Sequence, residues 1–178
     1  MDLVDLIAEK RFLGQEFLTW LWYKSDERSG TVFLPGTGDI QLVFEKHMLL
    51  EYGEGDSFEK IVCQGLQAEL KEARTGLRMG KKLEQARIHL ILGEYEWFLT
   101  LKGSMLEFRN VKLPKTMAGA EESDDPDAVG GRLLDRIGLL ETATRTVDDL
   151  FRMFLEIRIS SGWKEELDKL STWIHKNS

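Results

Sequence analysis

Short alternating segments fill the middle of this chain, and helical apolar patterns flank them on both sides. Apolar and polar residues alternate over 40–45 and again over 96–101, as they do in strands with one buried face. Turns that contain glycine separate these segments, which favours antiparallel pairing between neighbouring strands. Helices that precede and follow such strands bury their apolar sides on one face of the sheet. The sequence therefore predicts an α+β fold.

Helical segments are predicted at three places. The first runs to Tyr23 and is apolar on most of its faces, which is typical of a buried helix. The second, 66–79, is inserted between strands, and Gly80 is placed to cap its C-terminus. The last is a C-terminal pair, in which apolar residues keep near-heptad spacing over 132–159 and a short helix follows over 163–175. We therefore expect an antiparallel sheet with one inserted helix, an N-terminal helix and a C-terminal helical pair packed on it.

A polar, acidic segment divides the predicted chain. Dense like charge and low hydrophobicity over 115–130 favour solvation over packing. We expect an α+β core domain over 1–114, an acidic linker or loop over 115–130, and a C-terminal helical pair over 131–178 docked on the core.

Charge and cysteine content restrict the class of protein. The 178 residues include 24 Lys and Arg against 31 Asp and Glu, which gives a net charge of −7. Such a chain does not attract DNA through its overall field, so any contact with DNA needs a local basic patch. Cys63 is the only cysteine, and neither a signal peptide nor a membrane-spanning run is recognised. We therefore expect a cytoplasmic protein without a membrane partner. If the protein binds DNA, we expect it to be associated with the nucleoid.

One local basic patch is present. Six basic and two acidic residues occur over 71–87, against the negative charge of the whole chain. The residues that we expect to contact DNA phosphate or an acidic partner are Lys71, Arg74, Arg78, Lys81 and Lys82. The alternative is a solvated helix end, where the helix dipole favours cations.

An aromatic run in the first helix is the second candidate. Phe17, Trp20, Trp22 and Tyr23 lie among leucines, and core packing explains such a run without any function. An exposed part of the run would mark a partner surface, for which Trp20 and Trp22 are the candidates.

No pattern typical of catalysis or of metal binding is recognised. The carboxylates of the predicted strands show no paired spacing, and the three histidines lack the spacing of metal ligands. No serine lies in a nucleophile elbow. We therefore expect no catalytic residue, metal or cofactor. The alternative is a metal-dependent nuclease, which these patterns do not favour.

Several blocks of the sequence, in the same order, resemble the C-terminal region of the RdgC-like, recombination-associated proteins of bacteria. The most specific block is FLGQEFLTWLWYKS over 12–25, followed by EARTGLRMGKK over 72–82. Shorter matching blocks are KLPK over 112–115, DDP over 124–126 and FLEIR over 154–158. The resemblance covers most of the chain, but it does not extend to the ring-forming part of that family.

The resemblance implies a stand-alone accessory domain associated with DNA recombination or replication. The main region of the family resembles a ring around duplex DNA, and some members carry an exonuclease label, but no catalytic residue carries over to this chain. We expect a non-catalytic domain whose partner is either DNA, bound weakly and without sequence preference, or an RdgC-type ring protein. A homo-oligomer is also compatible with this expectation. A protein–protein module without DNA contact, which uses Trp20 and Trp22 or the C-terminal helices, is the alternative.

Overall fold

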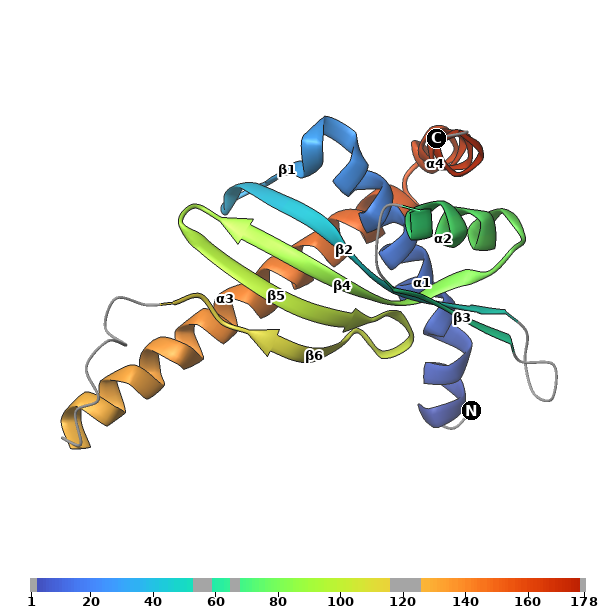
Figure 1. Ribbon diagram of the computed structural model, residues 1–178. Coiled ribbons are helices and arrows are strands. Elements are labelled where there is room, and N and C mark those ends of the chain that lie inside the picture. The colour runs from blue at the N-terminus through green and yellow to red at the C-terminus, as the bar shows by residue number, and fades with distance from the viewer. Residues whose placement is uncertain (1–2, 53–58, 65–67, 116–125, 177–178) are drawn as a thin grey trace.

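A computed structural model describes residues 3–52, 59–64, 68–115 and 126–176 (Figure 1). Its elements, in chain order, are α1 (Leu3–Asp26), η1 (Glu27–Gly30), β1 (Thr31–Leu34), β2 (Gly38–Tyr52), β3 (Glu59–Gln64), α2 (Ala68–Arg78), β4 (Lys82–Leu92), β5 (Tyr95–Lys102), η3 (Gly103–Met105), β6 (Glu107–Lys112), α3 (Pro126–Ile159) and α4 (Trp163–His175).

The described strands form one antiparallel sheet in the order β1-β2-β4-β5-β6. β2 is 15 residues long and pairs with β1 through its first half and with β3 through its second half. A bulge between Phe44 and Met48 bends β2 against β4. The inserted helix α2 connects β3 to β4, as the sequence predicts, and the α+β class is confirmed.

The helices α1 and α3 cross one face of this sheet (Figure 1). Alternate strand residues such as Leu42, Ile88 and Leu99 are buried against them, whereas Val43 of β2 is exposed. Period-two alternation therefore separates a core face from an open face. The open face carries an ion pair between Glu45 and Arg87 and a stack of His89 on Phe98.

The C-terminal helices share the core of the sheet and of α1. Leu150 and Phe154 of α3 are fully buried, and the ring centroid of Phe154 lies 5.6 Å from that of Trp20. Arg158 of α3 also forms an ion pair with Glu16 of α1 at 3.0 Å.

The boundary between the predicted linker and α3 differs from expectation. α3 begins at Pro126, inside the predicted linker 115–130. Proline is favoured in the first turn because it loses no hydrogen bond there, and Asp127 interacts favourably with the helix dipole. The rest of the acidic segment, 116–125, lies outside the described residues.

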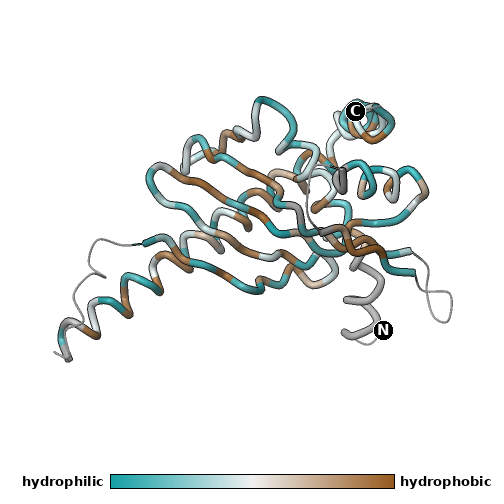
Figure 2. The backbone as a smooth tube through the Cα atoms, viewed as in Figure 1, coloured by the Kyte–Doolittle hydropathy of each residue, from teal (hydrophilic) through white to brown (hydrophobic). Residues whose placement is uncertain are grey.

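α3 is 34 residues long, and only its second half crosses the sheet. Its first half extends past the edge of the sheet, beside the end of β6 (Figure 1). Hydrophobic residues recur along this first half (Figure 2). The extension carries most of the candidate site described below.

Candidate functional site

The members of the predicted basic cluster lie along α2, just after it and at the start of β4, and they make separate contacts. Arg74 forms an ion pair with Asp26 of α1, and its guanidinium lies 4.8 Å from the ring centroid of Trp173. The same Asp26 carboxylate accepts a hydrogen bond from Trp173 Nε1 at 2.9 Å. Arg74 therefore joins α2 to both α1 and α4.

Arg78 contacts the C-terminal end of α4. Its Nε and Nη2 donate hydrogen bonds to the carbonyl oxygens of Ile174 and Lys176, at 2.7 and 2.9 Å. The last carbonyls of a helix have no donor partner within the helix, so a cation from elsewhere is a favourable partner. Arg78 thus caps α4 from a different helix.

Lys81 is also engaged within the protein. Its ammonium lies 2.6 Å from Glu59 Oε2, and only 8% of its side chain is exposed. This hydrogen bond, together with the positive charge, holds the pKa of Glu59 below its ordinary value. Lys71 and Lys82 are exposed.

Of the five predicted cations, three are therefore engaged with other groups of the protein. Anion binding by them stays a prediction, and a phosphate at Arg74 or Lys81 would compete with a carboxylate already in place. The local charge pattern indicated a binding site, whereas Arg74, Arg78 and Lys81 act as structural links between elements.

The proposed partner surface at Trp20 and Trp22 is wrong. Both side chains are fully buried in the core, where the ring of Trp22 meets that of Trp173 edge-on at 5.0 Å. Trp20 Nε1 donates to Glu166 Oε1 at 2.9 Å, which satisfies its polar atom in the interior. The rings bury more apolar area by packing between α1 and the C-terminal helices than they would on the surface.

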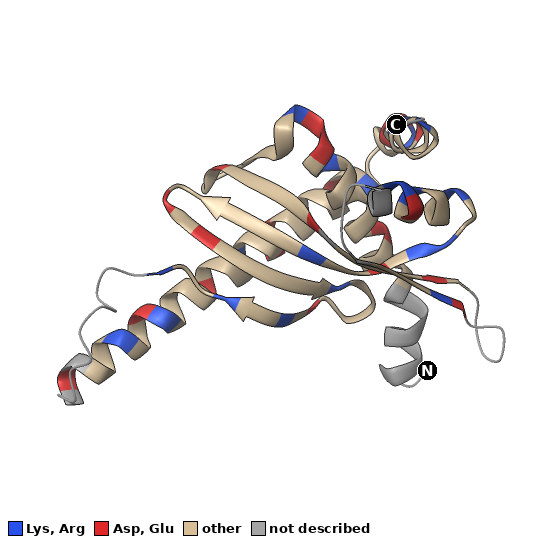
Figure 3. Cartoon of the chain, in the orientation of Figure 1, with Lys and Arg blue, Asp and Glu red and all other residues tan. Residues whose placement is uncertain are grey.

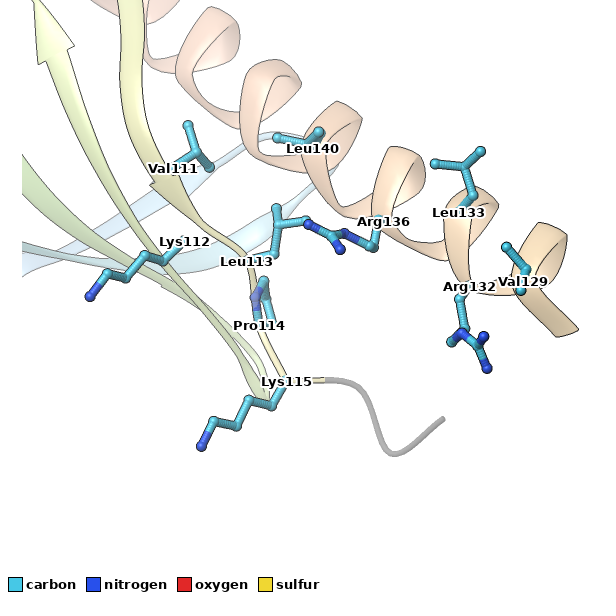
Figure 4. Close-up of a pocket in the computed structure, with 10 residues that line it drawn as sticks. All are labelled: Val111, Lys112, Leu113, Pro114, Lys115, Val129, Arg132, Leu133, Arg136 and Leu140. Atoms are coloured by element: carbon cyan, nitrogen blue, oxygen red, sulfur yellow. The ribbon is translucent and has the colours of Figure 1, made fainter. Parts of the chain in front are cut away.

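A groove lies between α3 and the segment that follows β6 and is a further candidate site. We call it the α3 groove; its volume is about 960 Å³, and it is lined by Val111, Lys112, Leu113, Pro114, Lys115, Val129, Arg132, Leu133, Arg136 and Leu140. One wall comes from β6 and the residues after it, and the other from the first half of α3 (Figure 4). The floor is apolar, and cations lie along both walls.

The side chains of the α3 groove point in different directions. Leu113 points toward α3, and Arg136 reaches from α3 toward Leu113 (Figure 4). Lys112 and Lys115 point away from α3, and Arg132 lies near the start of α3. The groove therefore combines apolar contact area inside with positive charge at its rim.

Both basic and acidic residues occur along the first half of α3 (Figure 3). Within the described part of the chain, the lining of the groove includes four cations and neither Asp nor Glu. The carboxylates of Asp127 and Asp135 belong to the same helix but are not among the lining residues. The described lining residues therefore carry a positive net charge, in a chain whose net charge is −7.

A polar cluster at Glu84 is buried and structural. Glu84 accepts hydrogen bonds from Gln15 Nε2, at 2.8 Å, and from Ser104 Oγ. These contacts satisfy both carboxylate oxygens and tie α1 to β4 and η3.

Over the described ranges, no group of three or more His, Cys, Asp or Glu side chains is arranged to hold a metal ion. No described helix is long and apolar enough to cross a membrane.

No family model matches this chain, and neither a curated protein nor a solved structure matches it significantly. The fold and the site define a class in structural terms. The chain is an α+β domain whose helices cover one face of an antiparallel sheet, and the first half of its longest helix borders a basic, apolar groove.

Sequence reasoning missed the α3 groove, although two signals for it were present. The near-heptad apolar spacing over 132–159 contains Leu133 and Leu140, and the short block KLPK contains Lys112 and Lys115. Neither signal shows that the two segments meet, because they are separated along the chain by the acidic segment.

Proposed function

We propose that this chain is a non-catalytic accessory domain of DNA recombination or replication, and that it binds an acidic protein partner in the α3 groove. The groove carries the proposal, because four cations border an apolar floor and the described lining contains no carboxylate. The resemblance of the sequence blocks to RdgC-like proteins supports the connection with DNA recombination.

The chemistry of the groove favours a protein over DNA as the partner. Phosphate contacts use cations and polar groups and gain little from an apolar floor. Protein interfaces combine an apolar centre with a polar rim, as Leu113 and the surrounding cations do here. The net charge of −7 also opposes the approach of duplex DNA.

The test compares two variants with equal loss of charge. The groove variant is Lys112→Gln, Lys115→Gln and Arg132→Gln. The matched control is Lys164→Gln, Lys176→Gln and Arg152→Gln, three exposed cations that belong neither to the groove nor to the predicted basic cluster. The immobilised proteins are exposed to a purified RdgC-type ring protein, to a synthetic amphipathic helix with Glu and Leu on one face, and to fluorescein-labelled duplex DNA.

We expect the unmodified protein and the control to retain the ring protein and the acidic helix, with retention that decreases as salt increases. The groove variant should bind about tenfold more weakly, equivalent to the loss of about 1.4 kcal/mol. Equal binding by the groove variant and the control would overturn the proposed site. Failure of the unmodified protein to retain either protein probe, or retention of DNA alone, would overturn the proposed function.

A further inference from the structure

A second pocket borders the first half of α3 along a different face of the helix. Its volume is about 910 Å³, and it opens between α3 and the turn that joins β4 to β5. We call it the hairpin pocket; its lining includes Leu92, Glu94, Tyr95, Leu134, Asp135 and Leu139. None of its described lining residues lines the α3 groove, so the two sites are separate.

Local structure positions both walls of the hairpin pocket. Gly93 has a φ of 60°, which favours glycine, and it begins the tight turn in which Glu94 follows. The opposite wall is one face of α3, because its lining residues Leu134 and Gly138 are one helical turn apart. Trp97 Nε1 of β5 donates a hydrogen bond to the carbonyl oxygen of Leu139 at 3.1 Å. This bond holds α3 against the strand from which the second wall extends.

The charge of the hairpin pocket is opposite to that of the α3 groove. Acidic residues occur at the turn between β4 and β5 and along the first half of α3 (Figure 3). Glu94 and Asp135 line the pocket, and its described lining contains no Lys, Arg or His. Both carboxylates are exposed, and neither has an ion-pair partner among the residues that the structure describes. A cation from outside the chain is therefore complementary to this site.

Apolar and aromatic surface lies beside these carboxylates. Tyr95 is 48% exposed and Leu134 is 69% exposed, and the ring centroid of Tyr95 lies 6.0 Å from that of the buried Trp97. Ion pairs at an exposed site contribute little by themselves, because water screens them. A cation with an aliphatic stem gains more, since the stem covers apolar side chains while the charged end meets a ring or a carboxylate.

The same combination of groups joins elements elsewhere in this protein. Arg158 forms an ion pair with Glu16, and its guanidinium lies 4.9 Å from the ring centroid of Trp163. Arg74 makes contacts of the same two kinds, as described above. In both places an arginine combines a carboxylate with an aromatic ring. The hairpin pocket supplies the carboxylates and the ring, and its described lining lacks the arginine.

We propose that the hairpin pocket binds an arginine side chain of a partner protein, together with the apolar residues next to that arginine. Arginine suits the site better than lysine, because a planar guanidinium stacks on a ring such as Tyr95 while it donates to a carboxylate. The volume of about 910 Å³ lies within the range of known ligand sites, roughly 300–1,000 Å³. Nucleic acid is a poor occupant, because its phosphates would meet Glu94 and Asp135. The inference does not rest on the acidic partner proposed for the α3 groove.

The first experiment measures by calorimetry how tightly short peptides bind to the full chain. The probe is an acetylated, amidated peptide with one arginine between two leucines, and its analogues carry the uncharged citrulline or lysine in place of arginine. We expect saturable binding of the arginine peptide that weakens as salt increases. The citrulline peptide should bind about tenfold more weakly and the lysine peptide about threefold more weakly.

Three outcomes of this experiment would overturn the proposal. The first is the absence of saturable binding by the arginine peptide. The second is equal affinity for the arginine and citrulline peptides, because the cation would then contribute nothing. The third is displacement of the peptide by an equal concentration of spermidine, which would show a site for small cations.

A pair of charge variants tests whether the hairpin pocket is the binding site. Glu94→Gln combined with Asp135→Asn removes both carboxylates and should weaken binding of the arginine peptide about tenfold. The matched control, Asp148→Asn combined with Glu156→Gln, removes two exposed carboxylates of α3 that lie outside the pocket and should leave the affinity unchanged. Equal affinities of the two double variants would contradict the assignment to the pocket.

A pair of glycine variants tests the site without a change of charge. A Cβ atom added at Gly138, which lines the pocket, would meet no atom within 4 Å, so Gly138→Leu fills this space without a clash. Gly131→Leu is the control, because a Cβ atom there is equally free and Gly131 lines neither the pocket nor the α3 groove. Both changes favour the helix, and only Gly138→Leu should weaken peptide binding, by about tenfold. The same affinity in both variants would count against the pocket.

The groove variant separates this proposal from the proposed function. The chain with Lys112→Gln, Lys115→Gln and Arg132→Gln keeps every described residue of the hairpin pocket and should bind the arginine peptide as the unmodified protein does. A loss of peptide affinity as large as that of the Glu94→Gln and Asp135→Asn variant would contradict the separation of the two sites.

Discussion

At the scale of single residues, two glycines determine how closely α1 approaches the sheet. A Cβ atom added at Gly14 would lie 1.8 Å from the carbonyl oxygen of Gly103 in η3. The backbones of the helix and the 3₁₀ turn are therefore in direct contact, and no side chain fits between them. The next residue, Gln15, makes use of this proximity to reach Glu84.

Gly14→Ala should destabilise the protein by about 1–3 kcal/mol, the usual cost of overpacking, because backbone atoms must move apart. The control is Gly138→Ala. Gly138 lies in the first half of α3, and a Cβ atom added there would meet no atom within 4 Å, so this change removes a helix-weakening glycine without a clash. It should be neutral or stabilise by up to about 1 kcal/mol. Urea unfolding of both variants checks the pair, and equal midpoints would contradict the close contact.

At the scale of elements, the sequence correctly predicted those helices and strands whose formation depends on residues that are close along the chain. The alternation over 40–45 and 96–101 predicted β2 and β5, and Gly80 predicted the end of α2. Gly80 has a φ of 84°, and Lys81 N donates to Gly76 O at 3.0 Å, which closes the helix. These features depend on residues that are close in sequence, so one sequence is enough to indicate them.

The candidate site depended on contacts between residues that are far apart in sequence. Arg74 meets Asp26 and Arg78 meets Ile174, so two members of the cluster that is predicted to bind an anion join helices. The heptad spacing over 132–159 predicted α3, but it could not show which half the sheet would cover. The size of the sheet decides which half of α3 is covered. The periodicity of apolar residues within the helix carries no information about the size of the sheet.

Arg78 gives the prediction that belongs to this scale. Arg78→Ala removes two charge-assisted hydrogen bonds to the end of α4, and we expect faster amide exchange in its last turn. The loss of global stability should be modest, about 1 kcal/mol, because solvent replaces the exposed donors. Lys71→Ala on the same helix is the matched control and should leave exchange in α4 unchanged. Equal exchange in both variants would show that Arg78 does not cap α4.

At the scale of the whole molecule, a polar network joins the two ends of the chain. Lys24 near the end of α1 forms ion pairs with Glu27, at 2.8 Å, and with Glu166 of α4, at 2.6 Å. Tyr23 donates a hydrogen bond to the second oxygen of Glu27 at 2.5 Å. The docking of α4 therefore depends on the ionisation of these groups.

Glu27 makes part of the stability sensitive to acid. Burial raises the pKa of its carboxyl, but hydrogen bonds from Lys24 and Tyr23 outweigh burial and hold the pKa below the ordinary value of 4.5. The folded state therefore favours the charged form, so this stabilisation is present above pH 4.5 and is lost as pH falls through the lowered pKa. Glu27→Gln should make urea midpoints less dependent on pH in this range. Glu94→Gln, on the exposed turn between β4 and β5, should not.

Tyr23 gives the corresponding prediction in alkali. Burial, followed by its hydrogen bond to the Glu27 carboxylate, raises the pKa of Tyr23 well above its ordinary value of 10.0. The folded state therefore keeps the proton at a pH where the unfolded chain loses it. The stabilisation is complete below about pH 10 and declines as pH rises further toward the raised pKa. Between about pH 9 and pH 11, urea midpoints of the unmodified protein should therefore fall more steeply than those of Tyr23→Phe, and the difference between the two proteins should narrow above about pH 10. Parallel curves for the two proteins across the whole range would mean that Tyr23 ionises equally in the folded and unfolded states, and the link between the two ends of the chain would then not depend on its proton.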